Sequence, residues 1–435
     1  MSKENILTEI KNKYLIIFFS LIVFLNHVNY LRINILDNIV FIPRLLMVIF
    51  IIIFLIYIYN SFILNNSKLE KKNLVYFLLF YFQALISLFI FNNDFFDDKK
   101  DLSLLFYFSY DFFKYSFIYF FFCIVGLNLI NYKNFFIQFK IYFSLSFIFI
   151  IFGFFLVLFY NLNDYELIQR VFYYDDFAIV GNRFYSVFGE PRDASVFLIT
   201  NLCILILLYR YLPYNFKLQI YPLFVLLIFL SIFSFFFTKS FASIVGLILG
   251  AFFFSIYFIK DYFLKKNILF NLFVLIILLI SLFFVYLIIS KIGRVGEYIS
   301  DVLILLNNPD ADIEKLRISL QSKDVVPLLK YAGYFSNFEL KNILFGNGTL
   351  SSYYLGELEF AHPHSFLSRV LFDNGLFGFG VLTLFVFSVL DDDSRLIDKF
   401  LLSMSYGSFL AVHSSSLYIL LMFLIYIKKS KKILN

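Results

Sequence analysis

Long apolar runs separated by short polar segments make up most of the chain. A run of about 20 apolar residues is what an α-helix needs to cross the hydrocarbon core of a bilayer. The runs predict membrane-spanning helices over residues 14–31, 39–59, 74–91, 108–130, 137–160, 194–211, 220–237, 241–259, 268–290 and 368–390, followed by an apolar stretch at 400–427. Because the runs lack the alternation of barrel strands, the sequence predicts an all-α polytopic membrane protein.

Lysines cluster in alternate loops between these predicted spans. They occur at the N-terminus and after the second, fourth and eighth spans, at Lys3, Lys11, Lys13, Lys68, Lys71, Lys72, Lys133, Lys140, Lys260, Lys265 and Lys266. Positive residues favour the cytoplasmic side, so these loops and the C-terminal KKSKK sequence are expected there. An even number of crossings is then required. We therefore predict that residues 400–427 break near the HSSS sequence into two short spans, giving about twelve spans with both ends in the cytoplasm.

This topology leaves two large loops outside the cytoplasm, residues 161–193 and 291–367. The second loop contains NNPDADIEKLRISLQSKDVV, in which Pro309, the acidic residues after it and apolar residues at helical spacing predict a surface helix. The sequence GNGT at 346–349 predicts a turn. We interpret residues 1–435 as a single polytopic membrane domain with an elaborated external cap.

Composition agrees with this class, since 61% of the residues are hydrophobic and 15% are charged. Cys123 and Cys203 each lie in an apolar run with no partner at a suitable spacing, so neither a disulfide framework nor a zinc site is predicted.

Arginine and lysine divide unevenly across the predicted membrane. Of ten arginines, Arg210 and Arg395 are placed inside and eight outside, whereas 17 of 26 lysines are placed inside. Guanidinium groups bind phosphate oxygens with two parallel hydrogen bonds, which lysine cannot do. The external arginines either pair with nearby loop acids or converge on an anionic ligand. A lipid-linked phosphate or diphosphate is the ligand that such a surface suits.

The sequence GNRFYSVFGEPRDASVFL runs from the first external loop into the sixth predicted span, and Arg183, Glu190, Arg192 and Asp193 lie at its membrane boundary. Glu190 precedes a proline, which places it on a turn before the helix begins. These charges serve either as helix caps and interfacial anchors or as part of a site at the mouth of the loop.

Three motifs carry a resemblance to a known family. They are RFYSVFGEPRDAS, then LRISL followed by NILFGNGTL, and then His364-Ser365 followed by Gly375 and Gly378 within AHPHSFLSRVLFDNGLFGFG. Together they resemble the O-antigen polymerase and ligase superfamily of bacterial membrane glycosyltransferases. The resemblance covers the architecture over nearly the whole chain and local motifs from about residue 181 to residue 380.

The resemblance implies an inverting sugar transfer from an undecaprenyl diphosphate carrier, at the periplasmic face of the bacterial inner membrane, without a metal or other cofactor. In a Wzy-type polymerase the donor is the growing glycan on its lipid, and the acceptor is a hydroxyl of the next lipid-linked repeat unit. The expected partners are these undecaprenyl-diphosphate-linked oligosaccharides and membrane lipid, with a chain-length regulator as a further candidate. Nucleic acid is not an expected partner.

The motifs also imply roles for individual residues. His364 occupies the matched position and is the candidate base, or the residue that positions the acceptor, because a neutral imidazole can take the proton of an attacking hydroxyl. Arg183 and Arg317 match the family pattern and are the first candidates for binding the diphosphate leaving group. His362 matches nothing, and a metal pair of His362 with His364 is discounted because no third ligand lies nearby.

Arg294 and Arg369 are the next candidates for diphosphate binding. Arg369 lies inside an apolar run, where an unpaired charge would be costly, and Asp373 at i+4 is its expected partner. Three further residues could contact substrate or orient an arginine: Glu190, Arg192 and Lys239. Lys239 also fits a plain interfacial lysine. Gly375 and Gly378 are interpreted as close-packing positions of the helix beneath the site.

Three other functions are weighed against polymerisation. An O-antigen ligase, which transfers finished glycan to lipid A core, shares the chemistry. The polymerase is favoured because this chain is very rich in Phe and Ile, as the products of variable polysaccharide gene clusters often are. A polysaccharide flippase would have short loops, which residues 291–367 contradict. An assembly or chain-length protein would have few spans and a large soluble domain.

Overall fold

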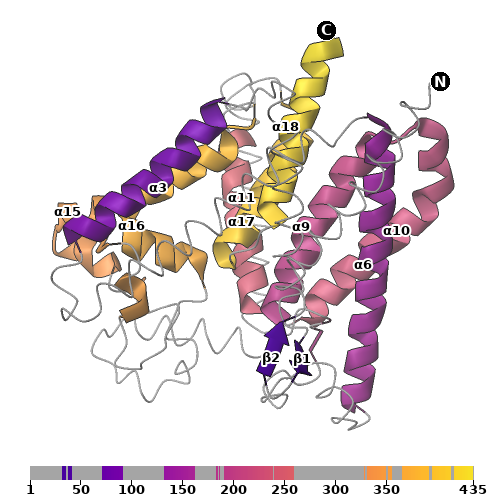
Figure 1. Ribbon diagram of the computed structural model, residues 1–435, viewed down its shortest axis with the longest axis horizontal. Helices are drawn as coiled ribbons and strands as arrows, with labels where there is room; N and C mark the ends of the chain where they lie inside the picture. Colours follow the sequence, from indigo (N-terminus) through magenta and orange to yellow (C-terminus); the bar gives the residue numbers. More distant parts are fainter. Residues whose placement is uncertain are drawn as a thin grey trace, which may run out of the picture. The chain divides into compact units, whose positions relative to one another are not determined.

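The described part of the chain is predominantly helical (Figure 1). The computed structural model describes residues 32–35, 38–41, 71–91, 132–161, 183–184, 186, 191–238, 240–258, 328, 331–348, 351–354, 365–390, 394–412 and 416–434. Its helices are α3 (Lys71–Phe91), α6 (Tyr132–Asn161), α9 (Pro191–Arg210), α10 (Tyr214–Phe237), α11 (Phe241–Phe258), α15 (Leu340–Phe345), α16 (Phe366–Phe387), α17 (Leu396–Ala411) and α18 (Ser416–Leu434). A 3-10 helix, η6, covers Ser351–Tyr354.

One short hairpin is the exception to the helical class within these residues. Strands β1 (Arg32–Ile35) and β2 (Asn38–Phe41) pair antiparallel, with Arg32 opposite Phe41 and Ile35 opposite Asn38. The segment is rich in Ile and Val, which favour extended backbone. The strand β2 occupies the first residues of the predicted span 39–59, so the span prediction does not hold at Ile39–Phe41.

Four described helices are long and apolar enough to cross a membrane. They are Phe136–Leu158, Pro191–Arg210, Tyr214–Phe237 and Phe366–Phe387, and they coincide with the predicted spans 137–160, 194–211, 220–237 and 368–390. Shorter apolar helices at Val75–Ile86, Ile244–Phe258 and Leu417–Lys428 match further predicted spans. These apolar helices are those of an all-α membrane protein. The predicted spans 14–31, 108–130 and 268–290 and most of 39–59 lie outside the described residues, as do most of the loops 161–193 and 291–367.

The apolar stretch 400–427 is divided between two helices. Helix α17 ends at Ala411 and α18 begins at Ser416, which is where the HSSS sequence predicted a break. Tyr406 of α17 is fully buried, and its hydroxyl shares a hydrogen bond of 2.9 Å with Thr383 of α16.

The chain divides into two compact units. Unit 1 comprises residues 1–79, 105–251 and 382–435, and unit 2 comprises residues 80–104 and 252–381. Helices α3, α11 and α16 contribute residues to both units. Each unit is described by itself below.

In unit 1, α6 and α9 run antiparallel. Phe139, near the start of α6, packs against Tyr209 at the end of α9, with ring centroids 6.1 Å apart. About three turns later along α6, Phe149 packs against Phe197 near the start of α9, with centroids 5.7 Å apart. The order of these contacts fixes the opposite direction of the two helices.

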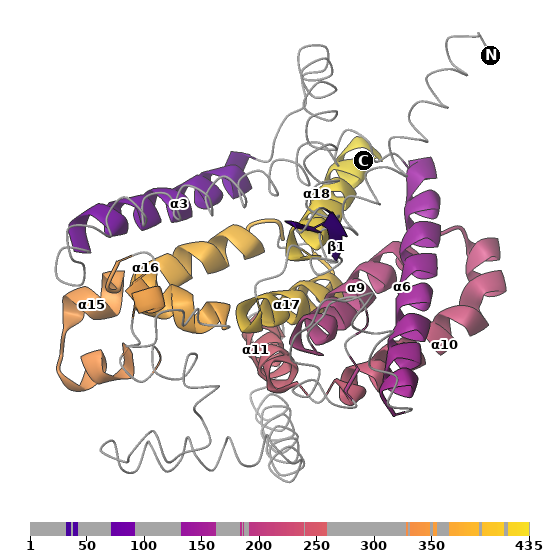
Figure 2. The same ribbon diagram turned by 60° about the horizontal axis from the view of Figure 1, so that its bottom comes forward.

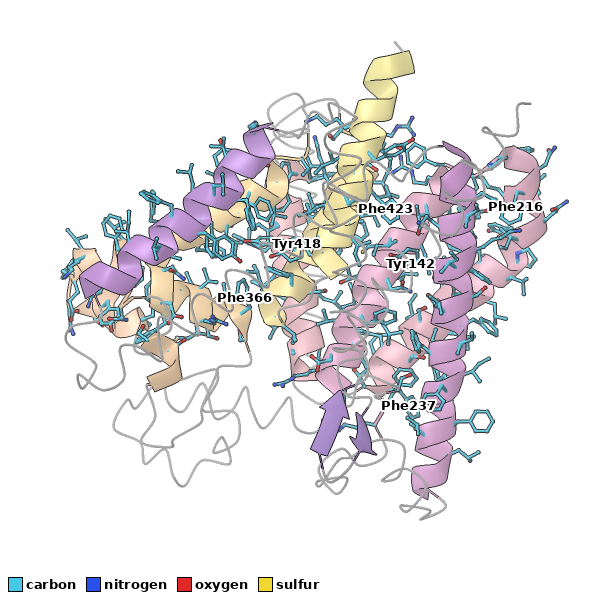
Figure 3. All side chains as sticks on the ribbon, in the orientation of Figure 1. Tyr142, Phe216, Phe237, Phe366, Tyr418 and Phe423 are labelled. Atoms are coloured by element: carbon cyan, nitrogen blue, oxygen red, sulfur yellow. The ribbon has the colours of Figure 1, made fainter. Side chains whose placement is uncertain are left out.

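Helix α10 runs parallel to α6. Phe136 of α6 contacts Phe216 at the start of α10, with centroids 4.3 Å apart, and Phe154 contacts Phe237 at its end, with centroids 6.3 Å apart. Phe216 and Phe237 lie at opposite ends of α10 (Figure 3). The helices α6, α9 and α10 lie side by side (Figure 2) and therefore alternate in direction, as consecutive membrane crossings must.

Small residues bring α11 and α17 into close contact. A Cβ added at Gly407 of α17 would lie 2.2 Å from the carbonyl oxygen of Gly246 and 2.3 Å from the backbone nitrogen of Gly250, both on α11. Small residues at helix contacts let backbones approach closely, which is a common way of packing helices in a membrane.

We expect Gly407→Ala to lower the free energy of unfolding by about 1–3 kcal/mol, because the added methyl group overlaps backbone atoms that cannot rotate away. Gly380→Ala is the matched control, since a Cβ there meets no atom within 4 Å. Equilibrium unfolding of the purified protein in mixed micelles measures both. Equal stability of the two variants would contradict the close contact.

Candidate functional site

Helix α16 is interrupted at Gly375, whose φ of 63° and ψ of −168° are not helical. A break of this kind leaves carbonyl groups before it and N–H groups after it without partners inside the helix. Because Gly375 lies within a predicted span, those groups must be satisfied by other parts of the protein. The groups that form hydrogen bonds with these carbonyl and N–H groups therefore define a polar site within unit 2.

The Gly-x-Gly turn supplies partners for the carbonyls before the break. The backbone N–H of Asn347 donates to the carbonyl of Phe372 at 2.9 Å, and that of Gly348 donates to the carbonyl of Asp373 at 3.0 Å. The side-chain amide of Asn347 adds a third bond, to the carbonyl of Phe372 at 3.3 Å. The hydroxyl of Tyr334 donates to Oδ1 of Asn347 at 2.8 Å, which fixes the orientation of that amide.

Two side chains from distant segments complete the arrangement. Nε2 of Gln83 on α3 donates to the carbonyl of Asn374 at 3.3 Å. The hydroxyl of Tyr331 donates to the carbonyl of Ile343 at 2.6 Å and accepts a backbone hydrogen bond from Leu376, just after the break. Burial raises the pKa of Tyr331 to about 12, so the phenol keeps the proton that it donates at neutral pH. The turn, α3 and α16 are thereby joined.

Glycine is required where the turn meets the break. A Cβ at Gly346, where φ is 75°, would lie 2.4 Å from the carbonyl oxygen of Asp373. At Gly375 it would lie 2.5 Å from the carbonyl oxygen of Leu344, and at Gly378 it would lie 2.9 Å from Oε1 of Gln83. The predicted turn at GNGT is confirmed for residues 346–348, which the structure describes, where Gly346 and Gly348 have positive φ. The predicted close packing at Gly375 and Gly378 is also confirmed.

We expect Gly375→Ala to cost at least about 2 kcal/mol, because it combines a left-handed backbone with overlap against Leu344. Gly333→Ala, in the same unit, is the control, since a Cβ there has no neighbour within 4 Å. The comparison is made by thermal unfolding in detergent. An unchanged Gly375→Ala variant would show that α16 can continue as an uninterrupted helix.

Arg369 and Asp373 form the predicted ion pair at the start of α16. Nε of Arg369 lies 3.8 Å from Oδ2 of Asp373. The other oxygen, Oδ1, accepts the backbone N–H of Ser352 at 2.8 Å and the hydroxyl of Ser351 at 3.2 Å. Asp373 is 1% exposed, whereas the Arg369 side chain keeps 17% exposure. The buried carboxylate thus holds both the arginine and η6 near the N-terminal end of α16.

Ser365 caps this helix. The backbone N–H of Ser368 donates to Oγ of Ser365 at 3.4 Å, which is the geometry of an N-cap residue bonded to the third residue of a helix. His364 immediately precedes the cap, two residues before Phe366, the first helical residue. The serine of the His-Ser motif therefore has a structural role that the sequence analysis did not assign.

In unit 1, the segment around Arg183 is fastened to α6 and to the end of α10. The backbone N–H of Phe184 donates to the carbonyl of Phe237 at 3.1 Å, and the hydroxyl of Ser186 donates to the carbonyl of Phe149 at 2.8 Å. A Cβ at Gly153 would lie 2.2 Å from the Phe184 ring, so the ring rests directly on the α6 backbone. Arg183 is half-buried next to this anchor.

Arg192 lies in the first turn of α9, where its carbonyl accepts the hydroxyl of Ser195 at 2.6 Å. The structure places Arg183 and Arg192 in unit 1 and Arg369 in unit 2. The remaining predicted site residues lie outside the described part of the chain: Glu190, Lys239, Arg294, Arg317 and His364. His362 also lies outside it.

Sequence analysis missed Gln83, Tyr331, Asn347, Ser351 and Ser352. Asn347 and the serine pair stand within or just after the Gly-x-Gly turn, so their position was a usable signal. Gln83 is a single polar residue in an apolar run, and nothing in the sequence around it indicates a role in the site. Within the described ranges, no group of three or more His, Cys, Asp or Glu side chains could hold a metal ion.

Comparison with known proteins gave no match to a protein-family model, to a curated protein or to a solved structure. The function is therefore argued from the sequence motifs and from the geometry around α16.

Proposed function

We propose that the protein is a membrane glycosyltransferase that polymerises undecaprenyl-diphosphate-linked oligosaccharide repeat units into O-antigen or a related surface polysaccharide. The observation that carries the proposal is the start of α16. Ser365, which follows His364 in the sequence, caps this helix, and the helix holds Arg369 on the buried carboxylate of Asp373. The structure thus fixes a candidate anion-binding residue, and the candidate base lies in the same sequence motif, which resembles the polymerase and ligase superfamily.

The proposed reaction uses these residue types directly. The acceptor hydroxyl oxygen attacks C1 of the donor sugar from the face opposite the diphosphate, and His364 takes the hydroxyl proton as the new bond forms. The bond between C1 and the diphosphate oxygen breaks, and the lipid diphosphate leaves with the electron pair. Arg183, Arg317, Arg294 and Arg369 are the candidates to stabilise the charge that develops on the leaving group.

The interrupted helix suits such a role. Membrane proteins place broken helices at polar sites, because the break lets backbone and side chains serve a ligand within an otherwise apolar layer. Here the break is held by the Gly-x-Gly turn and by Gln83. A site supported by such bonds keeps its side chains in a fixed geometry, which transfer between two lipid-borne substrates requires.

In this proposal the enzyme lies in the bacterial inner membrane with about twelve spans, both termini in the cytoplasm and the site at the periplasmic face. Glu190, Arg192 and Lys239 would contact sugar or orient an arginine. The reaction requires no metal or other cofactor. A chain-length regulator is a candidate partner.

Deletion of the gene followed by gel analysis of the lipopolysaccharide tests the proposal. We expect the mutant to retain core bearing a single repeat unit, with the long-chain ladder restored by the wild-type gene. Loss of all attached O antigen would identify a ligase instead. An unchanged ladder would contradict both enzyme functions.

A further inference from the structure

A group of lysines and aromatic rings lies at one end of α6, α9 and α10. We call Phe136, Lys140, Tyr209, Phe216 and Lys217 the basic-aromatic cluster. Nζ of Lys140 lies 4.2 Å from the centroid of the Phe136 ring and 5.8 Å from that of Phe216. Nζ of Lys217 lies 6.0 Å from the centroid of the Tyr209 ring. Two ammonium groups from different helices therefore meet the same aromatic surface.

The aromatic rings of the cluster pack on a buried residue of α6, Phe139. Phe139 is 0% exposed and contacts the rings of Tyr209 at 6.1 Å, Phe216 at 6.5 Å and Phe224 at 5.9 Å. Tyr209 and Phe224 stack with an interplanar angle of 7° and centroids 4.2 Å apart. The rings beneath the two lysines are thus fixed by contacts among three helices.

Among the described residues, no carboxylate pairs with the two lysines of the cluster. Arg210 uses its guanidinium in an ion pair of 2.5 Å with Asp398 at the start of α17. Nζ of Lys217 donates to the carbonyl of Arg210 at 2.7 Å, which places this ammonium at the end of α9. Neither Lys140 nor Lys217 contacts a carboxylate of the described residues.

An apolar face adjoins the lysines. Tyr214, Leu218 and Tyr221 lie at i, i+4 and i+7 on α10, on one side of the helix, and are 73%, 59% and 58% exposed. Tyrosines and lysines at the ends of membrane-spanning helices lie at headgroup level, with apolar side chains toward the acyl chains. The cluster therefore combines headgroup-level cations with an exposed surface that an acyl chain can cover.

We propose that the basic-aromatic cluster binds the headgroup phosphate of an anionic phospholipid in the bilayer leaflet at this end of the helices. Lys140 and Lys217 supply the charge, and the exposed face of α10 contacts the lipid tail. A lipid is favoured over a soluble anion because the cations are continuous with this apolar face. The proposal is independent of the glycosyltransferase function.

Native mass spectrometry of the full-length protein, released from micelles that contain phosphatidylglycerol or phosphatidylcholine, tests this site. We expect wild-type protein to retain phosphatidylglycerol in preference to phosphatidylcholine. Lys140→Gln and Lys217→Gln should each weaken that binding about fivefold, as expected for one lysine near an anionic membrane surface. Lys72→Gln, which removes an exposed lysine of α3 outside the cluster, should leave it unchanged.

Three results separate the proposal from its alternatives. Lys140→Arg with Lys217→Arg should keep phosphatidylglycerol bound, because both charges remain. Retention of phosphatidylglycerol by Lys140→Gln at the wild-type level would overturn the site, because this single change of an exposed side chain leaves the packing of the helices intact. Displacement of the lipid by an equal concentration of inorganic phosphate would also overturn it, since the cluster would then be a site for free anions.

Discussion

Asp373→Ala is expected to lower the free energy of unfolding by about 3–5 kcal/mol, because removing one partner of a buried ion pair leaves the other partner's charge uncompensated. The carboxylate accepts hydrogen bonds from Ser351 and Ser352 and lies 3.8 Å from Arg369. Its loss therefore releases η6 and the arginine together. Equilibrium unfolding of the purified protein in mixed micelles measures the change.

Asp373→Asn is the matched comparison. The asparagine keeps a side-chain oxygen that can accept from the backbone N–H of Ser352, but it loses the charge that pairs with Arg369. We expect its stability to fall between those of the wild type and Asp373→Ala. If the alanine and asparagine variants were both as stable as the wild type, Asp373 would not hold the start of α16 to the loop.

His364→Ala and Arg183→Ala are each expected to abolish long-chain glycan while the protein still reaches the membrane. A positioned general base contributes about 10²–10⁴-fold to a proton-transfer step, so loss of the His364 imidazole should leave no visible ladder on a gel. Loss of the Arg183 guanidinium should remove stabilisation of the departing diphosphate. Both variants are introduced into the deletion strain, and lipopolysaccharide gels are read beside immunoblots of the membrane fraction.

His362→Ala is the control for this pair, since His362 stands two residues from His364 and matches no motif. It should restore the full ladder. Normal long chains from both His364→Ala and Arg183→Ala would refute the assignment of the site.

Some features of unit 2 followed from local sequence. The pairing of Arg369 with Asp373 was predictable because an i+4 spacing puts two side chains on one face of a helix, and an arginine in an apolar run needs a counter-charge. The turn at 346–349 was predictable because its glycines favour left-handed backbone, and Gly346 and Gly348 have φ of 75° and 108°.

The interruption of α16 did not follow from the sequence. An apolar run predicts that a helix crosses the membrane, but it does not mark where backbone bonds are broken and replaced. The replacement bonds come from Asn347, Gly348 and Gln83, and Gln83 is 291 residues from its partner Asn374. Such a contact depends on tertiary packing, which hydrophobic periodicity does not encode.

The neighbours of each helix were equally hard to predict. Helices such as α6 and α10 are apolar on all sides, so their sequences do not indicate which face meets protein and which meets lipid. The contacts of Phe139 with α9 and α10 are therefore known only from the structure. The cation sites of the basic-aromatic cluster depend on the same packing.

The most direct test of the central claim is elongation of purified lipid-linked repeat units by the purified protein in proteoliposomes, with a metal chelator present. The account predicts glycans of two or more repeat units and release of undecaprenyl diphosphate by the wild-type protein, and neither product from His364→Ala. Wild-type protein that binds the lipid-linked units without lengthening them, or a His364→Ala variant that lengthens them at the wild-type rate, would contradict it.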